Sequence, residues 1–167
     1  AKTTLSDPDT IALRELTRQR FYLVDCISDI KRKVICLIDK IFPEYENIFT
    51  DMFGTTSLDL LSTYSCPETI ANLDTETLSN FLNKASKGRF GLTKAEEIQA
   101  YAKNTFGSFL FADSSSFALR QFLEQIKLLE KQVDELNSYI ADTLSKFDTT
   151  LTTINGIGST LAATFIA

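Results

Sequence analysis

The sequence predicts an all-α fold, with two long helices paired as an antiparallel coiled-coil hairpin and a cluster of short helices between them in the chain. Two observations predict this fold. Near each end of the chain, apolar residues recur at spacings of three and four over about four heptads. No segment shows the sustained alternation of apolar and polar residues that marks a half-buried strand.

The first long helix is predicted between Pro8 and Pro43. Asp7 can cap it, and Pro8 suits the first helical position because the N–H that proline lacks would have no partner there. Pro43 ends the helix, since proline cannot continue a helix interior. Arg20 is the one polar residue in its apolar stripe and either sets the register or extends to solvent, and we favour extension. The stripe consists of Leu13, Leu16, Arg20, Leu23, Ile27, Ile30, Val34, Leu37 and Ile41.

The second long helix repeats this pattern near the other end of the chain. Its flanking sequence, EQIKLLEKQVDELNS, is typical of the charged solvent face of a coiled coil. Two stripes of matched length predict that the helices pair antiparallel. The second stripe consists of Leu119, Phe122, Ile126, Leu129, Val133, Leu136, Ile140, Thr143 and Phe147.

Several short helices are predicted between the two long ones, because N-cap residues and glycines divide this region into short segments. The expected features are a helix over residues 43–52 before Gly54, a helix over 56–64, a capping box of Ser65 and Glu68, Asp74 as the N-cap of TETLSNFLNKAS, and a capping box of Thr93 and Glu96 in a helix ended by Gly107.

Composition narrows the classes of function. Histidine is absent from the 167 residues, which removes the commonest general base and the imidazole metal ligand. The three cysteines, Cys26, Cys36 and Cys66, have no C-x-x-C spacing, so neither a zinc site nor a disulfide framework is expected. The net charge of −5 argues against a protein that coats nucleic acid, although a local basic patch can still bind phosphate. With no long apolar run and no signal-peptide pattern, we expect a cytoplasmic protein without membrane contact.

One basic segment, KASKGRFGLTK, is a candidate nucleic-acid contact. It places Lys84, Lys87, Arg89 and Lys94 around Phe90, with two glycines between the predicted helices. Basic side chains and an aromatic ring in one loop can hold a phosphate backbone, with one nucleobase stacked on the ring. The alternative is an ordinary solvated turn, which is the more frequent meaning of such a cluster.

A second candidate lies in LTTINGIGSTLAATFIA, which has the form of a helix-hairpin-helix turn. Its two glycines let the chain reverse tightly and bring backbone N–H groups close to a phosphate, at the start of a helix near Ser159. The alternative is a plain corner between two helices. The candidate phosphate-binding residues are Asn155, Gly156, Ile157, Gly158 and Ser159.

Three segments, in this order, carry a family resemblance: LRELTRQRFYLVDCISDIKRKVICLIDKIFPEY, LDLLSTYSCPETIANLDTETLSNFLNKASKGRFG and INGIGSTLAATFIA. Together they resemble the RuvC-like, DEDD-type insertion-sequence transposases of the insertion sequence one-ten family. Asn155 departs from the family pattern, which usually has proline at that position.

The resemblance implies that residues 1–152 are the coiled-coil linker and dimerisation domain of a DNA transposase. Residues 153–167 would begin its C-terminal transposase domain. The family's catalytic carboxylates and nucleophilic serine would then lie outside this chain, so no catalytic or metal-binding residue and no cofactor is expected here. Ser159 lies in the turn and does not match the nucleophile's position. For the intact enzyme, the resemblance implies DNA strand exchange with a guide RNA and a divalent metal such as Mg²⁺.

A homodimer is also expected, because one hairpin and the short helices cannot cover both apolar stripes along their whole length. Flanking residues are expected to stay partly exposed: Phe21, Val24, Ile35, Ile38, Leu123 and Leu128. The alternative function is a stand-alone α-helical protein–protein interaction module without nucleic-acid binding. The expected dimer residues are Leu119, Phe122, Ile126, Leu129, Val133, Leu136 and Ile140.

Overall fold

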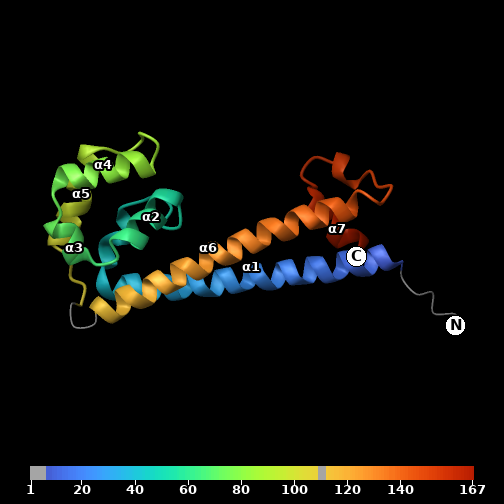
Figure 1. Cartoon of the computed structure of the whole chain (residues 1–167), viewed down its shortest axis with the longest axis horizontal. Coiled ribbons are helices and arrows are strands. Elements are labelled where there is room, and N and C mark those ends of the chain that lie inside the picture. The colour runs from blue at the N-terminus through green and yellow to red at the C-terminus, as the bar shows by residue number, and fades with distance from the viewer. Residues whose placement is uncertain (1–6, 109–111) are drawn as a thin grey trace. The chain divides into compact units, whose positions relative to one another are not determined.

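The computed structural model describes residues 7–108 and 112–167, and within these ranges it contains helices and no strand (Figure 1). The all-α prediction and the predicted pair of long helices are confirmed. The elements are α1 (Pro8–Ile41), η1 (Pro43–Asn47), α2 (Thr55–Thr63), α3 (Pro67–Asn72), α4 (Thr75–Ala85), α5 (Leu92–Lys103), α6 (Ala112–Leu144), η3 (Leu151–Thr153) and α7 (Ser159–Ile166).

The chain divides into two compact units, which are described one at a time. Unit 1 comprises residues 1–29 and 126–167, and unit 2 comprises residues 30–125. Helices α1 and α6 each contribute one part to each unit. The domain boundary predicted at residue 152 is a different division from these two units, and it stays a prediction.

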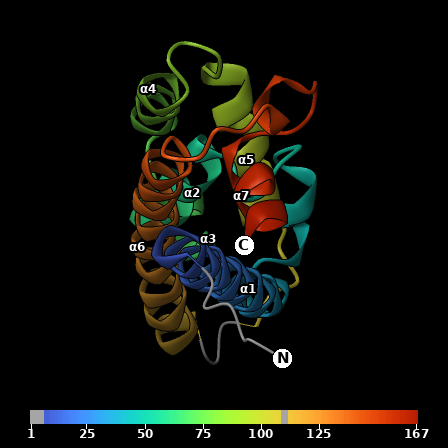
Figure 2. The same cartoon turned by 90° about the vertical axis from the view of Figure 1, so that its right-hand side faces the viewer.

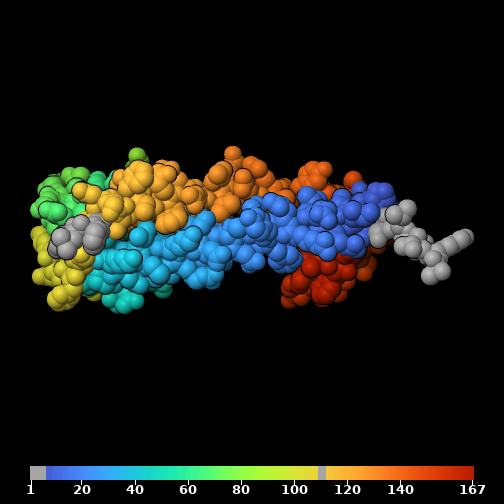
Figure 3. Space-filling model, turned by 90° about the horizontal axis from the view of Figure 1, so that it is seen from below, coloured from blue at the N-terminus to red at the C-terminus, as the bar shows by residue number. Residues whose placement is uncertain are grey.

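In unit 1, α1 and α6 pair antiparallel. Leu23 and Ile27 pack against Val133, whereas Asp9, near the start of α1, lies 3.0 Å from the Nζ of Lys146, just after α6. Later residues of α1 therefore meet earlier residues of α6, as the two stripes predict. The space-filling view shows the side chains of the two helices in direct contact (Figure 3).

Arg20 bonds across this helix pair. Its Nε donates a hydrogen bond of 2.6 Å to Oδ1 of Asn137 on α6. The hydroxyl of Thr160 on α7 also donates to that oxygen, at 3.4 Å. The expectation that Arg20 extends to solvent is therefore wrong, because its guanidinium has an acceptor on the facing helix. A polar pair inside an apolar seam fixes the register of the two helices.

Helix α7 packs beside α1 and α6, at the end of unit 1 where α1 begins and α6 ends (Figure 2). Ala162 and Ala163 are fully buried there against Leu13, Ile140 and Leu144. Their small side chains let the backbone of α7 come close to both long helices, and Ile166 of α7 also packs against this cluster.

Unit 2 contains the short helices, with α5 packed on α3 and α4, and α2 packed on α4. Buried Gln99 of α5 joins these elements. Its amide nitrogen donates to the carbonyl oxygens of Leu73, at 2.6 Å, and Ile70, at 3.3 Å, and its amide oxygen accepts from the Thr75 hydroxyl at 2.7 Å. Gln99 thus gives the Leu73 carbonyl a partner at the end of α3 and adds a second donor to the Ile70 carbonyl, which also accepts the Leu73 N–H at 3.3 Å.

The predicted N-caps in unit 2 are right in one case and wrong in two. Asp74 caps α4, with its Oδ2 2.9 Å from the N–H of Thr77. The N-cap of α3 is Cys66, because Pro67 takes the first helical position, and Ser65 instead lies buried beside Arg120. Helix α5 begins one residue before Thr93, which therefore falls inside the first turn.

Two predicted helix ends also differ from the structure. The helix expected over residues 43–52 is only a 3-10 turn over Pro43–Asn47. Helix α5 ends at Lys103, before Gly107. Gly107 instead packs against the end of α1, where a Cβ would lie 1.9 Å from the carbonyl oxygen of Ile41. Only glycine fits this close approach.

The expected dimer residues lie largely in the interior of a single chain. Leu119, Ile126 and Ile140 are fully buried, and Val133 is nearly so. A dimer contact through Leu119, Ile126, Val133 or Ile140 would require the helices of one chain to separate, so these four are corrected to intrachain core. Phe122, Leu129 and Leu136 are only partly buried.

The residues expected to flank the stripe divide into two groups. Phe21, Ile35 and Leu128 are exposed and Val24 is half-buried, as predicted, whereas Ile38 and Leu123 are buried. Phe21, Ile35 and Leu128 therefore leave exposed apolar area on the long helices. No helix in the described ranges has both the length and the apolar composition of a membrane span.

Candidate nucleic-acid interface

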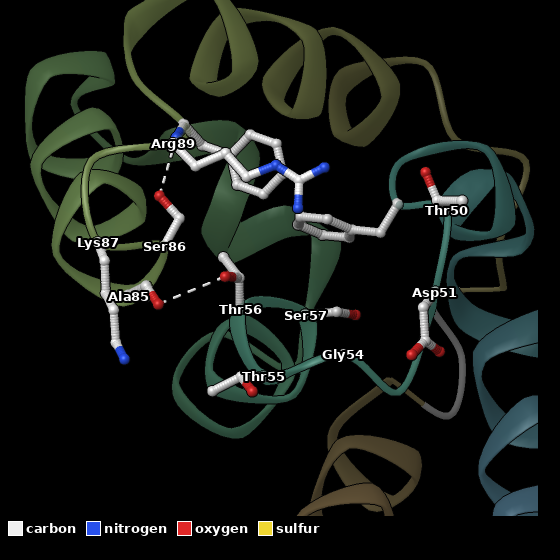
Figure 4. Close-up of a pocket in the computed structure, with 12 residues that line it drawn as sticks. Thr50, Asp51, Gly54, Thr55, Thr56, Ser57, Ala85, Ser86, Lys87 and Arg89 are labelled. Carbon is white, nitrogen blue, oxygen red and sulfur yellow. Dashed lines mark hydrogen bonds between the residues drawn. The ribbon is translucent and has the colours of Figure 1, made fainter. Parts of the chain in front are cut away.

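The basic loop between α4 and α5 begins with a Schellman motif. The Gly88 N–H donates to the carbonyl oxygen of Asn83 at 2.8 Å, and the Lys87 N–H donates to that of Lys84 at 3.3 Å. Lys87 has a φ of 55°, in the left-handed region, at the position where helices usually have glycine. The motif holds Lys87 at the tip of the loop. Figure 4 shows its side chain leaving the loop in a different direction from that of Arg89.

Three of the four predicted cations are available to a ligand. Lys84, Lys87 and Arg89 are exposed and have no ion-pair partner among the described residues. Lys94 differs, because its Nζ lies 3.0 Å from Oε2 of Glu97 and its side chain is only 18% exposed. Lys94 therefore takes part in the protein's own packing, and its role as a phosphate contact stays a prediction.

Phe90 is also part of that packing. Its ring meets the ring of Phe49 at 5.8 Å in an edge-to-face arrangement, and the Phe49 ring meets that of Tyr45 at 5.8 Å. The Arg89 guanidinium lies 5.3 Å from the centre of the Phe90 ring, and Lys94 Nζ lies 5.9 Å from it. Such contacts orient the cations by attraction to the ring face. Phe90 thus positions Arg89 and is not a bare platform on the surface.

A cavity of about 380 Å³ lies beside this loop. Its walls come from residues 49–51, the start of α2 at residues 54–57, and residues 85–90 (Figure 4). Two hydrogen bonds hold these walls: the Thr56 hydroxyl donates to the Ala85 carbonyl at 3.4 Å, and the Phe90 N–H donates to Oγ of Ser86 at 2.8 Å. The cavity was not predicted, because it depends on contact between segments about thirty residues apart.

The cavity combines charges of both signs. Arg89 and Lys87 line one wall, whereas Asp51 lies at the segment before α2. Oδ1 of Asp51 accepts the N–H of Phe53 at 2.9 Å, which fixes its carboxylate in a tight turn. The hydroxyls of Thr50 and Thr55 add neutral donors and acceptors to the lining.

The hydroxyl of buried Tyr45 contacts the first turn of α2. Its hydroxyl lies 2.8 Å from Oγ of Ser57, which in turn donates to the carbonyl oxygen of Met52 at 2.6 Å. Burial raises the pKa of Tyr45, so the phenol stays neutral and can donate to Ser57. This chain of hydrogen bonds fixes one wall of the cavity.

The glycine turn lies in unit 1 and has the predicted boundaries, since α7 begins at Ser159. Gly156 has a φ of +90°, which requires glycine, whereas Gly158 has a φ of −80° and is the N-cap of α7. Asn155 is exposed, and Ile157 packs on the cluster that contains Leu13. The element before the turn is the 3-10 helix η3 rather than an α-helix.

The two predicted sets of nucleic-acid-binding residues belong to different units, and each is a separate candidate. The part of the chain that the structure describes brings together no group of three or more Cys, Asp or Glu side chains that could hold a metal ion.

Comparison with family models, with curated proteins and with solved structures finds no match for this chain.

Proposed function

We propose that this chain is the helical coiled-coil module of a DNA transposase, in which it spaces and pairs the catalytic parts and contacts the nucleic-acid backbone. The sequence resemblance suggests the transposase context. The structural observation that supports a nucleic-acid contact is the exposed set of Lys84, Lys87 and Arg89, which has no carboxylate partner among the described residues.

A cluster of this kind binds phosphates even in an acidic chain. The net charge of −5 sets the field far from the molecule, but screening limits that field to about 8–10 Å at physiological salt. A phosphate at the loop therefore interacts mainly with the nearby cations. Each cation that neutralises a phosphate releases condensed counterions, which makes binding depend on salt.

A second function, protein–protein interaction, is favoured by a separate observation. Phe21 and Leu128 are 48% and 57% exposed on the long helices, although both are large apolar residues. Large exposed apolar side chains can form a contact surface where they lie together in one patch. This function and nucleic-acid binding use different residues and can coexist.

The test of nucleic-acid binding measures fluorescence anisotropy of a labelled DNA duplex across a range of salt concentrations. Replacing Lys84 and Arg89 with alanine should weaken binding and reduce the slope of log K against log salt by about 0.9 per lost phosphate contact. Lys40→Ala with Lys103→Ala is the matched control, because it also removes two positive charges from exposed residues of unit 2. Equal slopes for the two double variants would show that the loop is an ordinary solvated turn without a specific role in phosphate binding.

A further inference from the structure

We propose that the cavity beside the α4–α5 loop binds one nucleoside monophosphate unit, with its phosphate at Arg89 and Lys87 and its base and sugar in the cavity. This inference rests on the proposed contact with nucleic acid and adds the kind of ligand. The unit can come from a free nucleotide or from an unpaired residue of a single strand.

The size of the cavity is the first argument. A nucleic-acid strand that contacted only the three loop cations would lie on the protein surface and would not enter the cavity. The cavity holds about 380 Å³, within the range of about 300–1,000 Å³ found for small-molecule sites. It has room for one nucleotide unit and not for a duplex.

The second argument concerns the phosphate. Arg89 lines the cavity, and its guanidinium is held over the Phe90 ring at 5.3 Å from the ring centre. A planar guanidinium donates two parallel hydrogen bonds to a phosphate. Lys87 supplies a second positive charge on the same wall. In Figure 4 the Arg89 side chain extends from the loop across the cavity toward the segment of Thr50.

The third argument concerns the base and the sugar. Phe49 and Phe90 line the cavity, and Phe90 holds the Arg89 guanidinium over its ring, so that a nucleobase can stack on the arginine plane. The hydroxyls of Thr50 and Thr55 can bond to a sugar or to the edge of a base. Asp51 repels a second phosphate, because its carboxylate lies among the lining residues. The ligand therefore has one anionic end and one neutral, planar end.

The test uses the full 167-residue chain and four probes. These are a short single-stranded oligodeoxyadenosine, an abasic strand of the same length and charge, a duplex, and a fluorescent derivative of adenosine monophosphate. The oligodeoxyadenosine should bind about tenfold more tightly than the abasic strand, because only the former can stack a base.

Two variants locate the effect. Thr55→Phe adds a bulky ring at an exposed residue of the cavity lining and should lower the affinity for oligodeoxyadenosine to that of the abasic strand. Arg89→Lys keeps the charge but loses the guanidinium plane on which a base can stack, so it should also reduce the preference for a base. Thermal unfolding followed by circular dichroism checks that both variants keep the wild-type fold.

Each outcome decides between specific conclusions. Equal binding of the abasic strand and oligodeoxyadenosine would overturn the cavity proposal and leave the backbone contact standing. If no strand binds, the backbone contact fails, and binding of the fluorescent nucleotide that Thr55→Phe abolishes would support a free-nucleotide site. If the nucleotide does not bind either, or if polyglutamate displaces it as well as unlabelled nucleotide does, the cavity proposal is wrong.

Discussion

Gly156 and Gly158 stand two residues apart, yet their backbones differ. Gly156 has a φ of +90°, and Gly158 has a φ of −80° in an extended N-cap conformation that any residue can adopt. A Cβ at either position would meet no atom within 4 Å. Folding therefore needs glycine only at Gly156, and a requirement for glycine at Gly158 would come from a ligand that approaches the backbone.

The prediction at this scale is a difference between two alanine variants. Gly156→Ala should lower the free energy of unfolding by about 1–2 kcal/mol, because alanine is strained at positive φ. Gly158→Ala should leave it nearly unchanged. Urea denaturation of the two variants measures the difference. Equal losses of stability would contradict this account of the turn.

At the scale of elements, Glu44 of η1 holds the segment that follows α5. Its carboxylate accepts the Thr105 hydroxyl at 2.6 Å and the Phe106 N–H at 3.0 Å. Burial raises the pKa of Glu44, but these hydrogen bonds together lower it by more, so the pKa lies below its ordinary value of 4.5. The carboxylate thus stays charged at neutral pH and stabilises the folded state.

The sign of the pH dependence follows from that lowered pKa. The stabilisation by Glu44 is complete above its ordinary value of 4.5 and is lost as the pH falls through the lowered value. Glu44→Gln should therefore melt below the wild type at about pH 7, and the gap should close on acidification. Glu46→Gln is the control, because Glu46 is exposed on the same element and makes neither contact. A gap that persists at low pH would show that the carboxylate charge is not the cause.

The elements also show what a sequence can predict. The stripe in each long helix is a local pattern, so pairing of α1 with α6 could be predicted from spacing alone. The capping boxes at Ser65 and Thr93 were wrong because their residues match the pattern while Pro67 and the earlier start of α5 move the N-caps. A cap motif fixes a helix start only where no neighbour offers a better one.

At the scale of the whole molecule, the basic loop could be predicted from charge, but its cavity could not. The loop cations follow one another in the sequence, whereas the cavity depends on the packing of Phe49 and the start of α2 against Phe90. Lys94 shows the same limit, because its contacts with the rings of Phe49 and Phe90 depend on tertiary packing. Sequence reasoning finds charges, and tertiary packing decides which of them face a ligand.

The last prediction concerns self-association, which we propose through exposed residues of the long helices. Phe21 and Leu128 are about half exposed in the single chain. A two-fold dimer contact would bury both residues in each of the two chains, which makes four side chains. Completing the burial of four such side chains is worth about 3–6 kcal/mol. Phe21→Gln with Leu128→Gln should therefore raise the dimer dissociation constant by at least about 100-fold.

Analytical ultracentrifugation across a range of concentrations measures that constant. Gln121→Ala with Gln125→Ala serves as the control, because both glutamines are exposed on α6 and contribute little apolar area. Leu129→Asp with Leu136→Asp should instead unfold the helix pair, since these residues pack against Leu23 and Ile27 within one chain. Loss of the dimer with retained helix content then identifies the outer faces as the contact. A wild-type chain that stays monomeric at high concentration would rule out the dimer.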